Sequence, residues 1–349
     1  MTRKFKIGNT VIKQESNCFV VAEIGANHMG EVKIAEKMIL AAKDSGANAV
    51  KFQKRNNQEL FTNEMFDMPY VNSNSFAETY GLHREYLEFG QDEYSHLIEF
   101  SNKNNIMFFA TPFDFSSVDF LEQFNLPAYK TASADIINTP FLEYIASTGK
   151  PMIISTGGAS IDDVKRAYEK VSKYNNQISI LQCSSVYPAD PSDMNLAVIE
   201  TYMQEFKDNI IGLSDHQSGI AMALVGYVLG ARIIEKHFTL NRSMKGTDQP
   251  FSLEPVGLTK MIRDLNRAKD SMGSGEKKLL EKEKPAMYKL RKKLVASKDL
   301  KSGRILTKGD IAIKIPGDGT PPHQLDLFIG EKLNKSILKD ESLNIDHIN

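Results

Sequence analysis

Charged side chains lie inside four short apolar runs of this sequence, where side chains are normally buried. Glu23 lies in FVVAEIG, Lys51 in AVKFQ, Lys130 in AYKTA and Glu235 in IIEKH. A buried charge without a partner is prohibitively costly, so these four residues must face one another or a charged ligand. We therefore treat them as candidates for catalysis.

Hydroxyl and glycine residues near these charges indicate the kind of ligand. Serines and threonines follow several of the runs, and Gly157-Gly158 forms a turn that leads into a helix at Ala159. Together with the two lysines they would form a receptor for phosphate and carboxylate groups. Each hydroxyl taken singly has a simpler explanation, since a serine after a strand is commonly a helix cap.

Two histidines belong to neighbouring apolar runs and could share one divalent metal ion: His216 follows one run, and His237 is the last residue of the next. A lone histidine is more often a core residue than a ligand. Two imidazoles with water in the remaining positions describe a catalytic site, whereas a structural site is closed by four protein ligands. A metal beside a small dianionic substrate and carboxylates indicates Lewis-acid chemistry on a carbonyl.

Short apolar runs alternate with amphipathic segments of about ten to fifteen residues, as in repeated βαβ units. Eight such units in about 270 residues predict a (β/α)8 barrel. A doubly wound open sheet is the alternative, and the absence of GxGxxG after the first run counts against it. The predicted strands are Phe19–Ile24, Ala49–Phe52, Met107–Ala110, Ala128–Lys130, Met152–Ser155, Ile178–Gln182, Ile210–Leu213 and Ile233–His237.

Polar residues occur at the end of every predicted strand. Barrel enzymes carry their chemistry at the C-terminal ends of the strands, so we expect these side chains to converge at one mouth. In chain order they include Glu23, Lys51, Gln53, Thr111, Lys130, Ser133, Asp135, Ser155, Ser185, Tyr187, Ser214, His216, Glu235 and His237.

Composition excludes several classes of protein. The 349 residues suffice for one large domain and a small one, and 43 basic against 44 acidic residues argue against nucleic-acid or membrane-surface binding. Two cysteines make no disulfide framework, and MTRKFKIGNTVIKQ contains no apolar signal segment. The most apolar stretch, 219–231, is too short to span a bilayer. We expect a cytoplasmic protein.

Motifs along the whole chain resemble the sialic acid synthase (N-acetylneuraminate synthase) family. They include VAEIGANHMG at 21–30, TPFD at 111–114, LQCSSVYP at 181–188, GLSDH at 212–216 and KGTDQPFSLEP at 245–255. The resemblance implies a TIM barrel with a small C-terminal antifreeze-like (SAF) domain. The implied boundaries are a barrel with an N-terminal hairpin over 1–273, a linker over 274–290 and a cap over 291–349.

The resemblance also implies an activity and roles for residues. Phosphoenolpyruvate condenses with N-acetylmannosamine, its 6-phosphate or a related N-acyl hexosamine, in a domain-swapped homodimer that needs Mn²⁺, or alternatively Mg²⁺ or Co²⁺. Implied metal ligands are His216 and His237. Catalytic roles fall on Glu23, Lys51, Lys130, Asp135 and Glu235, and substrate-binding roles on Gln53, Thr111, Ser133, Ser155, Ser185, Tyr187, Ser214 and Asp248.

Several points stay open at this stage. Another phosphoenolpyruvate-using sugar-acid synthase or a metal aldolase on the same barrel is one alternative, and a catalytically silent sugar-binding homologue is another. His28 could brace a loop or take part in catalysis. His83 and Arg84 could bind a sugar phosphate or belong to a structured loop. Lys314-Ile315-Pro316 lacks an arginine that many bacterial members have there.

Overall fold

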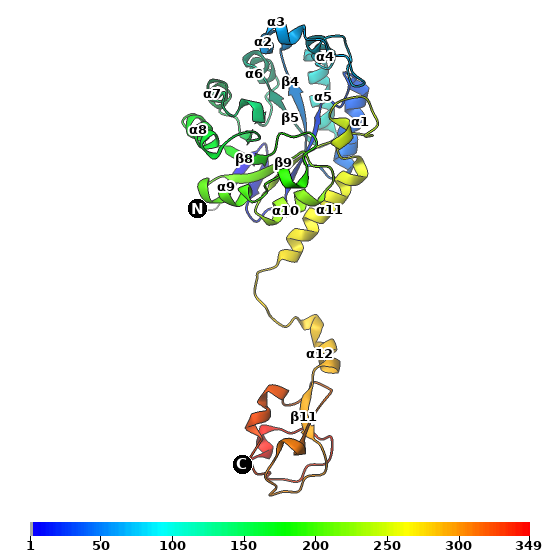
Figure 1. Cartoon of the computed structure of the whole chain (residues 1–349), viewed down its shortest axis with the longest axis vertical. Coiled ribbons are helices and arrows are strands. Elements are labelled where there is room, and N and C mark those ends of the chain that lie inside the picture. The colour runs from blue at the N-terminus through cyan, green and yellow to red at the C-terminus, as the bar shows by residue number, and fades with distance from the viewer. Residues whose placement is uncertain (1–2) are drawn as a thin grey trace. The chain divides into compact units, whose positions relative to one another are not determined.

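The computed structural model describes residues 3–349, which divide into two compact units (Figure 1). The first unit ends at Gly273 and the second spans Ser274–Asn349.

The first unit is a closed barrel of eight parallel strands surrounded by helices, so the predicted (β/α)8 fold is confirmed and the open-sheet alternative is wrong (Figure 1). Neighbouring strands follow the order β10-β3-β4-β5-β6-β7-β8-β9 around the barrel. Their bounds are β3 (Phe19–Gly25), β4 (Ala49–Lys54), β5 (Met107–Pro112), β6 (Tyr129–Thr131), β7 (Met152–Ser155), β8 (Ile178–Cys183), β9 (Ile210–Asp215) and β10 (Ile233–His237).

The main helices of this unit lie on the outside of the barrel and bury one face against it. In α8, Val164, Ala167 and Val171 are buried, which is the spacing of one helix face, and the Ser160 side chain caps the first turn. The helices are α1 (Val32–Asp44), α2 (Asn57–Leu60), α3 (Asn63–Phe66), α4 (Tyr80–Tyr86), α5 (Gln91–Lys103), α6 (Phe115–Glu122), α7 (Thr139–Ser147), α8 (Ile161–Val171), α9 (Val198–Glu205), α10 (Ala221–Val228) and α11 (Pro255–Met272).

Alternation along the strands divides each strand between two environments. Val20 and Ala22 of β3 pack in the larger core together with residues of the surrounding helices. Phe19 and Val21 belong instead to a separate apolar cluster with residues from the other strands. Because side chains alternate faces, Glu23 continues the inward-facing set of β3.

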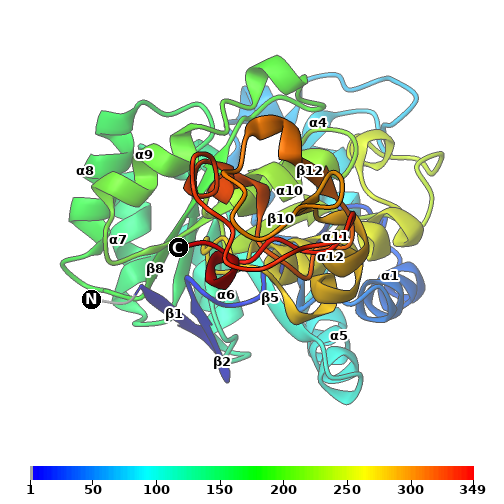
Figure 2. The same cartoon turned by 90° about the horizontal axis from the view of Figure 1, so that it is seen from below.

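An antiparallel hairpin of β1 (Lys4–Ile7) and β2 (Thr10–Lys13) precedes the barrel and is dark blue in Figure 2. Its Phe5, Ile7 and Ile12 are buried in the same cluster as the first inward-facing residues of the strands. The hairpin therefore fills the N-terminal end of the barrel interior with apolar side chains.

The second unit is small and has its own core. The strands β11 (Lys293–Ala296) and β12 (Ile311–Lys314) pair antiparallel, and Leu294, Phe328 and Leu343 are buried beside them. The segment expected as a linker includes a short 3-10 turn and helix α12 (Lys284–Leu290).

Both cysteines, Cys18 and Cys183, are buried and carry free thiols. Within residues 3–349, none of the helices combines the length and the apolar character that crossing a bilayer requires.

Candidate active site

One cavity of about 700 Å³ opens at the C-terminal ends of the barrel strands. All but one of the site residues expected from the sequence line it. Those that line it are Glu23, Lys51, Gln53, Thr111, Lys130, Ser133, Ser155, Ser185, Tyr187, Ser214, His216, Glu235, His237 and Asp248. The exception is Asp135.

Strand alternation explains why these side chains meet. On β10, Ile233 is in the inner apolar cluster, and Glu235 and His237 line the cavity two and four residues later. On β4, Ala49 is in the inner cluster, and Lys51 and Gln53 line the cavity. Each strand thus contributes apolar residues near its start and polar ones near its end to the same interior.

Two lysines and two glutamates form a buried charge cluster on the cavity floor. Lys51 Nζ lies 2.7 Å from Glu23 Oε2 and 3.7 Å from Glu235 Oε1. Lys130 Nζ lies 3.6 Å from Glu235 Oε1, and Lys51 also donates to Thr111 Oγ1 at 2.8 Å. All four charged side chains are nearly inaccessible to solvent. Both lysines line the cavity, and Glu235 is the carboxylate that they share, so an anionic ligand in the cavity would find two ammonium groups close together.

The surroundings push the two glutamate pKa values apart. Burial raises the pKa of Glu23, and its contact with Lys51 offsets this only in part. Burial also disfavours charge on Glu235, but Lys130 and Lys51 outweigh it and lower the pKa of Glu235. Separated carboxyl pKa values are typical of sites where one group carries a proton and the other stays ionised.

A cradle of hydroxyl groups lies beside Lys130. Lys130 Nζ donates to Ser155 Oγ at 2.5 Å, and the Gly157 amide donates to Ser133 Oγ at 2.9 Å. A Cβ at position 157 would lie 2.1 Å from Ser185 Oγ and 2.9 Å from Ser133 Oγ. Glycine is therefore required there for these hydroxyls to approach the turn.

His216 and His237 face each other at the cavity wall, with ring centroids 5.3 Å apart. The His216 Nδ1 atom lies 2.9 Å from the Ser184 carbonyl oxygen and donates to it, so Nε2 is the nitrogen with a free lone pair when the ring is neutral. His237 Nδ1 is buried without a hydrogen-bond partner and lies 3.6 Å from Asp248 Oδ2. Burial lowers the pKa of His237 to about 4, which keeps the ring neutral.

These two rings fit a divalent metal as donors. A neutral imidazole with an oriented ring is the form that binds metal. A buried ring nitrogen without a hydrogen-bond partner, such as His237 Nδ1, is consistent with a metal ligand. Among residues 3–349, no group of three or more His, Cys, Asp and Glu side chains is arranged as a metal cage. Further ligands would be water or substrate oxygens.

Asp135, expected among the catalytic residues, and His28 and His83, whose roles were left open, are not in the cavity lining. Asp135 sits in a 3-10 turn and accepts a hydrogen bond from Asn138 at 3.3 Å. His28 is buried, stacks on Phe89 at 4.0 Å and accepts from the Gly30 amide. His83 accepts from the amide of Phe76. Both histidines brace backbone segments.

The cavity lining also includes Arg55 and Cys183, which the sequence did not indicate as site residues, and Arg84, for which a role in binding a sugar phosphate or in a structured loop was left open. Arg55 follows β4 and continues the alternation through Lys51 and Gln53, so strand pattern could have found it. Cys183 likewise ends β8 on the inward face. Arg84 comes from helix α4 in the segment between β4 and β5, which has no strand periodicity to reveal it.

The fold and cavity define a TIM barrel whose strand ends form a receptor for an anion, with a pair of imidazoles at its wall. The NeuB family matches residues 38–277, and the SAF domain matches residues 291–349. The chain therefore belongs to the NeuB family.

Relatives extend along almost the whole chain. Human N-acetylneuraminate-9-phosphate synthase is 38% identical over 93% of this chain and 91% of its own length. N,N'-diacetyllegionaminic acid synthase of Campylobacter jejuni is 35% identical over 92% and 97%. The crystal structure of a sialic acid synthetase from Leptospira borgpetersenii, in complex with citrate, superposes with a TM-score of 0.72 at 34% identity, over 82% of this chain and 95% of that one.

Proposed function

We propose that this protein condenses phosphoenolpyruvate with an N-acyl hexosamine to give a nonulosonic acid and inorganic phosphate. One observation carries the proposal: Lys51 and Lys130 meet the serine hydroxyls and the two imidazoles in a single cavity. Lysines, hydroxyls and a glycine turn suit an enol phosphate, and the adjoining polar wall suits a sugar. The names of the relatives support the same product class.

The bonds change as follows in the proposed reaction. C3 of phosphoenolpyruvate forms a bond to the aldehyde carbon of the open-chain sugar, and the aldehyde oxygen gains a proton. Water adds at C2, where positive charge develops. The bond between C2 and the phosphate oxygen then breaks, so the products are the keto acid and inorganic phosphate.

The buried lysines and glutamates have different roles in this proposed reaction. Lys51 and Lys130 hold the phosphate and carboxylate of phosphoenolpyruvate, since both line the cavity and the ion pairs of both include the shared carboxylate of Glu235. Glu23, whose pKa burial raises, is our candidate for moving the proton. Its other oxygen accepts from Gln53 at 2.6 Å, which fixes the orientation of the carboxyl.

His216 and His237 are the residues that would hold a divalent metal, Mn²⁺ in our proposal with Mg²⁺ or Co²⁺ as alternatives. When bound, such an ion supplies Lewis-acid polarisation of a carbonyl. Asp248 faces His237, and the Tyr187 ring lies 4.2 Å from that of His216, so both help to orient the imidazoles.

The test is an assay of phosphate release. The protein is incubated with Mn²⁺, phosphoenolpyruvate and, separately, N-acetylmannosamine, its 6-phosphate and diacetylated dideoxy hexosamines. We expect release with at least one sugar and none without sugar. The Lys130→Met variant should raise the KM for phosphoenolpyruvate about 100-fold, because it removes a charge-assisted contact. No release above the protein-free blank with any sugar would refute the proposal.

Two finer points belong to the same proposal. The human relative has a 9-phosphate in its name and the legionaminic acid synthase does not, so the comparisons leave the phosphorylation of the sugar open. We also propose a homodimer in which the SAF unit of one chain covers the cavity of the other. Light scattering on the full chain tests this, and a monomer at assay concentration would contradict it.

A further inference from the structure

Two guanidinium groups, Arg55 and Arg84, line the same cavity as Lys51 and Lys130 but have no task in the reaction described above. The lysines already provide positive charge for phosphoenolpyruvate. A second pair of cations in the same cavity is suited to bind a second anionic group, in addition to those of phosphoenolpyruvate.

The place of Arg55 follows from strand geometry. Lys51, Gln53 and Arg55 occupy alternate positions along β4 and just beyond its end, and all three line the cavity. At about 3.3 Å per residue, Arg55 lies roughly 13 Å along the chain from Lys51. It is therefore well outward of the cavity floor, where the lysines lie.

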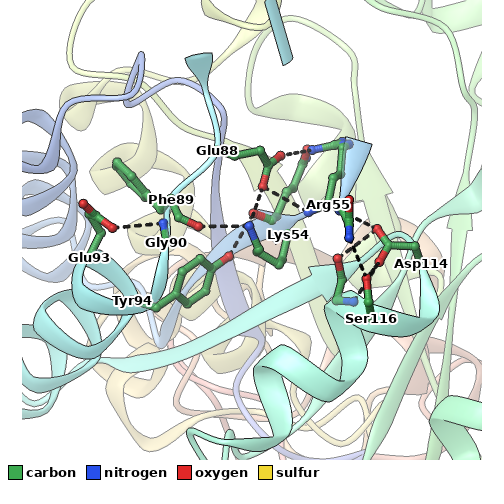
Figure 3. Close-up of polar contacts among 12 residues, drawn as sticks. Lys54, Arg55, Glu88, Phe89, Gly90, Glu93, Tyr94, Asp114 and Ser116 are labelled. Atoms are coloured by element: carbon green, nitrogen blue, oxygen red, sulfur yellow. Dashed lines mark hydrogen bonds and ion pairs between the residues drawn. The ribbon is translucent and has the colours of Figure 1, made fainter. Parts of the chain in front are cut away.

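The Arg55 side chain is held in one orientation. It stacks on the Phe113 ring with its central carbon 3.7 Å from the ring centroid, and it donates to Gln53 Oε1 at 2.6 Å. Its nearest carboxylate partner is Glu88, with Nη1 and Oε1 3.7 Å apart (Figure 3). Glu88 also accepts from Lys54 Nζ at 3.3 Å and from the Arg55 amide at 3.0 Å. One carboxylate therefore serves two cations.

Arg84 has weaker partners. Its Nε donates to the Tyr80 hydroxyl at 3.3 Å, and its guanidinium lies 5.5 Å from the centre of the Tyr80 ring. Within residues 3–349, no carboxylate oxygen lies within 4.0 Å of Arg84. Burial first and the positive charge of Arg84 second lower the pKa of Arg55 to about 10. The two guanidiniums thus repel each other, and an anion between them would remove that cost.

We infer that Arg55 and Arg84 bind a phosphate group on the terminal carbon of the hexosamine, so that the substrate is a sugar phosphate. The inference rests on the proposed function and names its sugar class. Phosphoenolpyruvate supplies the three carbons nearest the lysines, and the sugar chain extends outward from the new bond. Its last carbon is then the one farthest from the lysines, on the side where the arginines lie.

The experiment compares two sugars as substrates of the full-length wild type and of one full-length variant. N-acetylmannosamine 6-phosphate and N-acetylmannosamine are assayed with Mn²⁺ and saturating phosphoenolpyruvate, for the wild type and for Arg84→Gln. We expect the wild type to prefer the phosphorylated sugar. Arg84→Gln should lower kcat/KM for that sugar about 10- to 100-fold, mostly through KM, because it removes a charge-assisted contact. The value for the unphosphorylated sugar should change less than about threefold.

Arg84 is the better position to change, because Arg55 is buried and its removal could disturb folding. Arg84→Lys keeps the charge and should restore part of the lost kcat/KM, although an ammonium lacks the fork of a guanidinium. Arg263→Gln changes an exposed arginine on α11 that does not line the cavity. It should leave kcat/KM unchanged for both sugars. Thermal unfolding of each variant checks that the fold is retained.

Three results would overturn the inference. The first is equal use of both sugars by the wild type, and the second is an equal loss for both sugars in Arg84→Gln. The third is a rise in the KM for phosphoenolpyruvate in Arg84→Gln, which would assign the arginines to that phosphate instead. Calorimetric binding of N-acetylmannosamine 6-phosphate to the wild type and Arg84→Gln needs no turnover. It therefore separates this inference from a failure of the proposed reaction.

Discussion

The two ends of the barrel interior are built from the same strands but differ in character: one end is a packed apolar core, and the other is a polar cavity. At the N-terminal end, Phe5, Val21 and Ile153 pack in one apolar cluster. At the C-terminal end, Lys51 and Glu235 lie among hydroxyls and imidazoles around the cavity. Alternate positions on one strand lead from the first environment to the second. The difference teaches that apolar packing stabilises one end of the barrel, whereas the other end holds the proposed active site.

The free energy of burying side chains has opposite signs at the two ends. Burial of apolar side chains stabilises the fold by about 25 cal/mol per Å² removed from water. Burial of the ionisable groups has a cost, since it raises the pKa of Glu23 and lowers that of Lys130. A mutation at one end should therefore change stability, and a mutation at the other should change activity.

The largest expected effect is on turnover at the C-terminal end. His216→Ala and His237→Ala should each lower kcat by more than about 10³-fold, equivalent to about 4 kcal/mol of transition-state stabilisation, because each removes a proposed metal ligand. Bound Mn²⁺, measured by elemental analysis of the dialysed protein, should fall with it.

Two controls sharpen this test. His96→Ala changes an exposed histidine that pairs with Glu36 and lies outside the cavity lining, and it should keep full activity and metal. Wild-type activity that survives exhaustive chelation would contradict a metal role for the two imidazoles.

The next effect in size is on stability at the N-terminal end. Phe5→Ala should lower the free energy of unfolding by about 3–5 kcal/mol, because it leaves a cavity where the hairpin fills the barrel. Denaturant unfolding measures the loss, and kcat/KM per folded molecule should stay unchanged. Val11→Ala, at an exposed position of the same hairpin, should cost less than about 0.5 kcal/mol. A large loss of kcat in Phe5→Ala below its unfolding transition would break the separation of the two ends.

Strand alternation made most of the fold and cavity predictable from the sequence. Every predicted strand is present, and β7 and β10 have the predicted bounds. Glu23, Lys51 and His237 line the cavity because a period of two places them on the inner face.

Other features depend on contacts between segments far apart in sequence. Arg84 reaches the cavity from a helix in a long irregular segment, and no periodicity marks it. Asp135 was expected among the catalytic residues, but the 3-10 turn at Ser133–Asp135 places Ser133 in the cavity lining and Asp135 outside it. In a 3-10 turn, successive side chains are spaced three residues per turn, so the strand period of two does not predict which of them face the cavity.

The smallest expected effect concerns Asp135, a buried acid at the border of the polar end. Burial raises the pKa of its carboxyl from 3.8 to about 6, against a hydrogen bond from Asn138 that acts in the opposite direction. Because the folded-state pKa lies above the unfolded one, the protonated form is favoured by folding. Its contribution to stability is complete below about pH 4 and is lost as pH rises through about 6.

Asp135→Asn should therefore gain stability over the wild type as pH rises from 4 to 8. Two pKa units correspond to about 3 kcal/mol, and partial access to solvent reduces the expected gain to about 1–2 kcal/mol. Urea unfolding at several pH values measures it, with Asp190→Asn at an exposed aspartate as the control. A gain that is the same at pH 4 and pH 8 would show that ionised Asp135 carries no burial cost. The cost of burying ionised groups at the polar end would then come from the lysine and glutamate cluster alone, and only that cluster would distinguish the energetics of this end from those of the apolar end.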